Sequence, residues 1–71
     1  MSEYVEVDVR GLSCPEPVML TANALKKNPG AKLRILASEA HVRTNVEKLL
    51  KSKKVSFSSR EEGREYVIET D

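Results

Sequence analysis

The sequence contains a single cysteine, Cys14, and its neighbours favour a thiol that is displayed rather than cross-linked. Pro15 and Pro17 follow it closely, and each proline fixes φ at about −65°, so Cys14 lies on a stiff corner of the chain. The absence of a second cysteine excludes an internal disulfide and a redox cycle between two cysteines of this chain. A single displayed thiol can instead hold a persulfide, Cys–S–SH, and pass its outer sulfur to a thiol of another protein.

Cys14 also lies where a helix is expected to begin. Unpaired backbone N–H groups and the positive end of the helix dipole stabilise a thiolate there and lower the thiol pKa. Pro15 and Pro17 remove two of these donors, and the carboxylate of Glu16 opposes thiolate formation. Arg10 offsets the carboxylate if its side chain folds back over the helix start. The sequence does not fix which of these effects is larger.

Two other interpretations of the cysteine stay open. Free cysteine is among the most buried residue types, so Cys14 can be a structural residue in a non-enzymatic regulatory or protein-interaction module. Hydrolysis by a Cys–His pair requires that His41, the single histidine, reaches Cys14. One cysteine and one histidine make no recognisable metal-binding cluster, and we expect neither a metal nor a cofactor.

The residues on either side of Cys14 predict a strand followed by a helix. Apolar and other side chains alternate over residues 4–9, which is typical of a half-buried strand. Pro15 suits the first helical position, where its missing N–H costs nothing, and Pro29 ends the helix. We expect the helix to face the sheet with Val18, Ala22 and Leu25, and to turn Met19, Leu20 and Ala24 away from it.

The second half of the chain predicts one more helix and three strands. A strand is expected at 32–37, and Ser38 is a plausible N-cap for the helix after it. The apolar stripe of that helix is Val42, Val46, Leu49 and Leu50. Two short strands follow at 55–58 and 65–69, joined by a turn at 61–63. The order β-α-β-α-β-β predicts an α/β (α+β) two-layer sandwich, with both helices on one face of a mixed four-stranded sheet and one domain over residues 1–71.

Composition narrows the class of protein further. The net charge of +1 argues against a stable nucleic-acid binder, although RNA binding through the lysines is a third, weaker hypothesis. The first residues lack the basic start and apolar run of a signal peptide, and no stretch is long and apolar enough for a membrane span. We therefore expect a cytoplasmic protein that does not act at a membrane.

The pattern Asp8-x-Arg10-Gly11-x-x-Cys14-Pro15-x-Pro17 resembles the signature of the TusA (SirA-like) family of small sulfur-carrier proteins. The similarity extends over nearly the whole chain in length and element order. It implies the same two-layer fold and a persulfide on Cys14. It also implies that six neighbours position the cysteine or meet the partner: Asp8, Arg10, Gly11, Pro15, Glu16 and Pro17.

The resemblance further implies partners on both sides of a sulfur relay. The donor is expected to be a cysteine desulfurase or another sulfur-donor protein, and the acceptor a downstream protein. In this family the sulfur serves tRNA thiolation, cofactor biosynthesis or sulfur metabolism. The chain departs from the family at residues 38–41, where many members have an Asp-Pro segment, and at Asn45, where an acidic residue is frequent. The departure leaves the identity of donor and acceptor open.

Overall fold

The computed structural model describes residues 4–13 and 16–70, so Cys14 and Pro15 lie outside the described residues. The elements are β1 (Tyr4–Asp8), α1 (Glu16–Lys27), β2 (Lys32–Ala37), α2 (Ala40–Ser52), β3 (Phe57–Glu62) and β4 (Glu65–Thr70). The predicted order of strands and helices is confirmed. Neither of these helices has the length and apolar character needed to cross a membrane.

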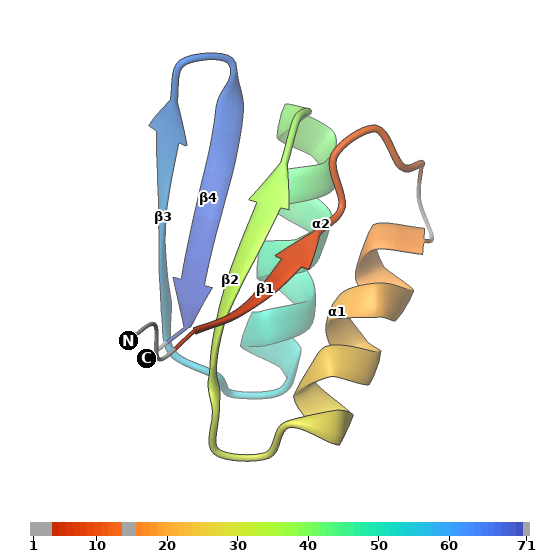
Figure 1. Cartoon of the computed structure of the whole chain (residues 1–71), viewed down its shortest axis with the longest axis vertical. Coiled ribbons are helices and arrows are strands. Elements are labelled where there is room, and N and C mark those ends of the chain that lie inside the picture. The colour runs from red at the N-terminus through yellow and green to blue at the C-terminus, as the bar shows by residue number, and fades with distance from the viewer. Residues whose placement is uncertain (1–3, 14–15, 71) are drawn as a thin grey trace.

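The four strands form one mixed sheet in the order β1-β2-β4-β3. β1 is parallel to β2, whereas β4 is antiparallel to both β2 and β3. β2 and β3 therefore run in the same direction, but β4 lies between them. Both helices cover the same face of the sheet (Figure 1), which confirms the predicted two-layer sandwich.

The core lies between β2 and α2. Strand alternation turns Leu33, Ile35 and Ala37 towards the helices, and all three are fully buried. Burial of a side chain as large as that of Leu33 or Ile35 stabilises the fold by about 1.5–3 kcal/mol. The buried core cluster consists of Val9, Leu33, Ile35, Ala37, Val42, Val46, Leu50 and Ile68.

The buried stripe of α1 differs from the predicted one. The fully buried residues are Pro17 and Thr21, whereas Val18 and Ala22 are only half-buried. The Thr21 hydroxyl donates a hydrogen bond of 2.8 Å to the Pro17 carbonyl oxygen, and this bond allows a polar residue at a core position. Ala24, expected on the outer side, packs against the core beside Leu25. The buried face of α1 is thus shifted by about one residue from the predicted face. The apolar pattern did not indicate Thr21 as a core residue, because threonine is polar.

The other side of α1 agrees with the prediction. Met19 and Leu20 are the exposed large apolar residues of the described chain, at 57% and 42% relative exposure.

The start of α2 also differs from the prediction. The N-cap position is Glu39, which makes no side-chain capping bond, and Ser38 is therefore not the cap. The hydroxyl oxygen of Ser38 instead accepts a hydrogen bond from the backbone of the β1–α1 loop. In the predicted stripe of α2, Val42, Val46 and Leu50 are buried, while Leu49 is half-buried.

The third strand lies later in the chain than the predicted range 55–58. β3 covers Phe57–Glu62, and it pairs with β4 from Phe57 to Glu62 along its whole length. The turn therefore lies at Gly63 and Arg64, with Gly63 at a φ of +64°. Residues 58–62 are polar and exposed, so they lack the alternation that a half-buried strand shows.

Candidate functional site

The β1–α1 loop leads the chain from the sheet to the cysteine segment. The Val9 N–H donates a hydrogen bond of 2.9 Å to the Leu36 carbonyl oxygen, which extends the pairing of β1 with β2 by one residue. The Leu12 N–H donates to the Val9 carbonyl oxygen at 3.3 Å and closes a turn. Gly11, inside this turn, has a φ of +79°, a conformation that favours glycine. The backbone before Cys14 therefore follows a defined path as far as Ser13.

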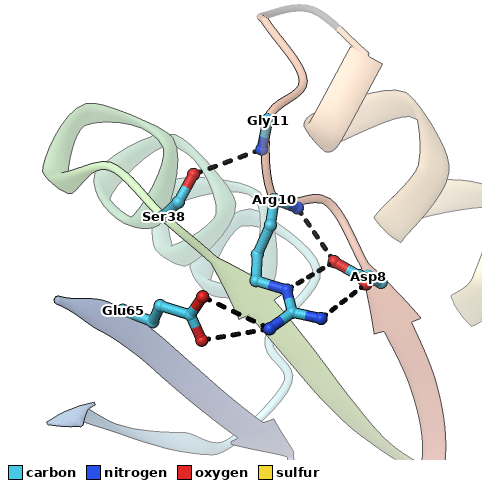
Figure 2. A network of polar contacts seen from close by, with 5 residues as sticks. All are labelled: Asp8, Arg10, Gly11, Ser38 and Glu65. Atoms are coloured by element: carbon cyan, nitrogen blue, oxygen red, sulfur yellow. Dashed lines mark hydrogen bonds and ion pairs between the residues drawn. The ribbon is translucent and has the colours of Figure 1, made fainter. Parts of the chain in front are cut away.

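Arg10 is held by two carboxylates, one from each side of β2 (Figure 2). The backbone N–H and Nε of Arg10 donate to Asp8 Oδ1 at 3.1 and 2.9 Å, and Nη2 donates to Asp8 Oδ2 at 2.9 Å. Nη1 donates to both carboxylate oxygens of Glu65, at 3.1 and 3.3 Å. The planar guanidinium suits such multiple contacts, which fix direction as well as distance. Arg10 thus joins the end of β1 to the beginning of β4.

The electrostatics of this group follow from its hydrogen bonds. The side-chain hydrogen bond from Arg10, followed by the backbone one, lowers the pKa of Asp8 from 3.8 to about 2. Hydrogen bonds to Asp8 and Glu65 raise the pKa of Arg10 above its ordinary value. All three side chains remain 40–49% exposed, so water screens their attraction. We therefore expect these contacts to fix the position of the loop more than they increase the free energy of unfolding.

Ser38 provides a second anchor for the same loop. Its Oγ accepts a hydrogen bond of 3.2 Å from the Gly11 N–H (Figure 2). Ser38 directly follows β2, whereas Glu65 begins β4. The loop before the cysteine is therefore bonded to β1, to β4 and to the β2–α2 connection.

The chain is anchored again directly after the cysteine segment. The Glu16 N–H donates to the Ser13 carbonyl oxygen at 3.0 Å, and this bond spans residues 14–15. Pro17 is fully buried, and the Thr21 hydroxyl binds its carbonyl oxygen. Glu16 is exposed in the first turn of α1. Both flanks of the cysteine segment are thus fixed by described contacts.

Three of the predicted site residues lie together before the cysteine segment, and two more lie directly after it. Asp8, Arg10 and Gly11 form the anchored loop, while Glu16 and Pro17 begin α1. Cys14 and Pro15, the remaining predicted site residues, lie outside the described residues, so their roles remain predictions.

Two conditional expectations about charged neighbours can be compared with the structure. The sequence allows Arg10 to offset the carboxylate of Glu16, but the guanidinium binds Asp8 and Glu65 instead. His41 is exposed, and its Nδ1 lies 3.3 Å from Glu39 Oε1. A hydrolytic Cys–His pair therefore gains no support from the described contacts.

Glu65 was not identified from the sequence as a site residue, and Ser38 was assigned a different role. Glu65 lies 55 residues from Arg10 in the chain, and only the placement of β4 beside β2 brings the two together. A serine between a strand and a helix is a common N-cap, which explains the misassignment of Ser38. Among residues 4–13 and 16–70, no three His, Cys, Asp or Glu side chains form a group that could hold a metal ion.

Comparison with known proteins identifies the family. The family model described as "Sulfurtransferase TusA" matches residues 5–69. The crystal structure of a SirA-like protein from Desulfitobacterium hafniense has the same fold, with a TM-score of 0.81, 19% sequence identity and coverage of 92% of each chain. No curated protein matches the chain. Since the model covers nearly the whole sequence, including the anchored loop and the start of α1, the chain belongs to the TusA family of sulfurtransferases.

Proposed function

We propose that this protein is a sulfur carrier that accepts sulfane sulfur as a persulfide on Cys14 and relays it to a partner protein. The observation that supports this most directly is the family match over residues 5–69, which encloses the single cysteine. The contacts on both sides of residues 14–15 add to it, because a thiol that exchanges sulfur with another protein needs a defined position.

The proposed transfer needs no oxidant or reductant. The Cys14 thiolate attacks the outer sulfur of a persulfide on the donor, R–S–SH. A new S–S bond forms at Cys14, the S–S bond of the donor breaks, and the donor leaves as a thiol after taking up a proton. In the second step an acceptor thiolate attacks the outer sulfur of Cys14–S–SH, and Cys14 leaves as the thiolate.

The neighbouring residues position the thiol rather than react. Arg10, clamped by Asp8 and Glu65, fixes the loop to the sheet, and Gly11 provides the turn and the hydrogen bond to Ser38. Beyond the cysteine, Pro15 stiffens the corner, while Pro17 anchors the start of α1 and Glu16 faces the partner.

The proposed partners are a cysteine desulfurase or another persulfide-bearing donor, and a downstream acceptor with a reactive thiol. The relayed sulfur then serves tRNA thiolation, cofactor biosynthesis or sulfur metabolism. A reducing cytoplasm suits this role, since it keeps a single thiol free for exchange. We propose no cofactor, because the sulfur itself is the cargo.

The full chain can be tested by incubation with a cysteine desulfurase and cysteine, followed by intact mass measurement. One persulfide adds about 32 Da to the wild-type chain. The Cys14→Ser variant should gain nothing, and treatment with a reductant should remove the added sulfur from the wild type. A wild type that gains no mass, or a variant that gains as much, contradicts the proposal for that donor.

A non-enzymatic interaction module with a structural Cys14 is the second candidate, and the exposed Met19 and Leu20 favour it. In that case Cys14→Ala leaves the biological activity intact, whereas charged substitutions of Met19 or Leu20 abolish it. Under the sulfur-carrier proposal, Cys14→Ala abolishes the activity by itself.

A further inference from the structure

The two edges of the sheet have different surfaces. β3 forms one edge, and its last five residues are polar and exposed, with charges that discourage pairing with another strand. β1 forms the other edge, where the exposed Glu6 and Asp8 alternate with the half-buried Val5 and Val7. The β1 edge is therefore the more apolar of the two.

The backbone of β1 has hydrogen-bonding groups that face away from the sheet. The Val9 N–H binds the Leu36 carbonyl oxygen, and Asp8 is the register partner of Leu36. In a parallel ladder, alternate residues direct both backbone groups to the same side. Val7 and Val9 thus bond to β2, and the N–H and C=O groups of Glu6 and Asp8 point outwards. Within residues 4–13 and 16–70, no backbone group pairs with them.

A groove of about 360 Å³ lies along this edge, between β1 and α1. Val5, Val7, Leu20 and Ala24 give it an apolar wall. Its charged lining residues are Glu6 and Asp8 on β1 and Lys27 at the C-terminal end of α1, so Lys27 is the cation of the groove. Because α1 runs antiparallel to β1 (Figure 1), Lys27 lies at the end of the groove far from the anchored loop.

The outward backbone groups of β1 and the groove beside it together specify the kind of peptide that can bind there. The outward N–H and C=O groups are satisfied by an extended backbone, whereas a helix uses its own backbone groups internally. Alternate side chains of an added strand point to one face, so apolar residues at every second position enter the groove. The ammonium group of Lys27 favours a carboxylate at that end.

We propose that an extended peptide segment of the sulfur-exchanging partner docks on the β1 edge as an additional strand, with alternating apolar side chains in the groove and an acidic residue beside Lys27. The identity of the partner rests on the proposed function, but the docking mode does not. Cys14 closely follows β1 in the sequence, so a segment on this edge lies at the strand that leads into the cysteine loop.

The test uses the isotope-labelled full chain and a library of cysteine-free synthetic peptides of about eight residues, the length of an ordinary strand. We expect the selected peptides to alternate apolar and polar residues, to lack internal proline and to have an acidic residue at one end. In the complex, the backbone amides of Glu6 and Asp8 should exchange with solvent more slowly than in the free protein. Control peptides of the same composition but shuffled sequence should not slow the exchange of these amides.

Two variants of one residue separate the backbone contact from the side chain. Glu6→Pro removes an outward N–H that β2 does not use, and proline is tolerated at such edge positions. It should weaken binding roughly five-fold or more, the cost of one lost hydrogen bond. Glu6→Gln keeps the N–H and should bind about as well as the wild type. If Glu6→Pro does not fold, Leu20→Lys tests the groove in its place, with Met19→Lys as the matched control outside it.

Three results would overturn the docking mode: no peptide selected above background, protection at β3 instead of β1, or selection of helical peptides. Self-association of the free chain that Glu6→Pro abolishes would overturn it too, since the edge would then serve a second copy. None of these measurements involves sulfur. If the wild type takes up sulfur and Cys14→Ser does not, while both bind the peptides equally, both proposals are supported. If the wild type takes up sulfur but binds no peptide, only the docking proposal fails.

Discussion

Two arginine–carboxylate clusters occur on this small sheet, and they connect different kinds of structure. In the first, Arg10 binds Asp8 and Glu65 and so ties the β1–α1 loop to two strands. The backbone of this loop has few hydrogen bonds of its own to the sheet. Without the cluster, the direction in which the chain leaves β1 is less well determined.

In the second cluster, Glu69 accepts hydrogen bonds from Arg34 at 2.8 Å and from Arg60 at 2.9 Å. Arg60 also pairs with Glu62, and hydrogen bonds from Arg60 and Arg34 lower the pKa of Glu69. All of these residues belong to β2, β3 and β4, whose backbones are already paired.

The comparison shows that similar ion pairs contribute differently to local structure. Their contribution depends on how many backbone hydrogen bonds already fix the segments that they join. Exposed pairs such as those of Arg10 contribute about 0–1 kcal/mol each, so the first cluster does not decide whether the chain folds. In the second cluster, Glu69 is only 16% exposed. The strands of the second cluster keep their positions without it. The loop of the first cluster has less of that support, so of the two clusters only this one should affect the neighbouring cysteine.

The largest expected effect comes from breaking the first cluster. Arg10→Ala should lower the initial rate of sulfur uptake by Cys14 roughly ten-fold or more, because small displacements of a reacting group are costly. Arg60→Ala, the matched change in the second cluster, should alter that rate less than about two-fold. Time-resolved intact mass measurement gives both rates, and circular dichroism checks that both variants are folded. Equal losses in the two variants would remove the distinction between the clusters.

A matched pair of glycines tests the turn in the same way. Gly11 and Gly63 both have positive φ, and an added Cβ meets no atom within 4 Å at either position. Each Gly→Ala change should therefore destabilise the fold by about 1–2 kcal/mol through backbone strain alone, as measured by urea unfolding. Only Gly11→Ala should also slow sulfur uptake. A rate for Gly63→Ala as low as that for Gly11→Ala would mean that strain anywhere in the chain disturbs the cysteine.

Acid should weaken the first cluster in a defined pH range. The pKa of Asp8 is lowered from 3.8 to about 2 in the folded chain, so its contribution to stability is fully present above pH 3.8 and is lost as the pH falls towards 2. The thermal midpoint of the wild type should fall over this range more steeply than that of Asp8→Asn. Glu69→Gln should reduce the slope as well, because hydrogen bonds from Arg60 and Arg34 lower the pKa of Glu69. If Asp8→Asn leaves the acid slope unchanged, Asp8 does not pair with Arg10 in solution.

The smallest expected effect is the loss of the Ser38 anchor. Ser38→Ala removes one neutral hydrogen-bond acceptor, so we expect faster amide exchange at Gly11 and roughly a two-fold lower rate of sulfur uptake. Ser38→Thr keeps the hydroxyl and should restore both values. Ser52→Ala removes a hydroxyl that binds within the last turn of α2, and it should change neither.

Local patterns predicted most of the elements. In β2, alternation placed Leu33, Ile35 and Ala37 in the core, where they are fully buried. In α2, the helical period did the same for Val42 and Val46. These predictions succeeded because strand and helix geometry fix which neighbouring side chains share a face.

The predictions that failed depended on contacts that a local pattern does not encode. Thr21 is a core residue because its hydroxyl binds the chain one turn earlier, and β3 is a strand because β4 supplies its hydrogen bonds. Ser38 binds Gly11 rather than capping α2. Each of these outcomes depends on a partner, not on the residue's own hydropathy.

The sequence by itself determined that one cysteine, followed closely by two prolines, lies between a strand and a helix, because residue order and side-chain periodicity are properties of the chain alone. The tertiary structure alone decided that Glu65, distant in the chain, clamps Arg10 beside that segment. The reason is the position of β4 between β2 and β3, which follows from how the whole sheet assembles and not from any single stretch of residues.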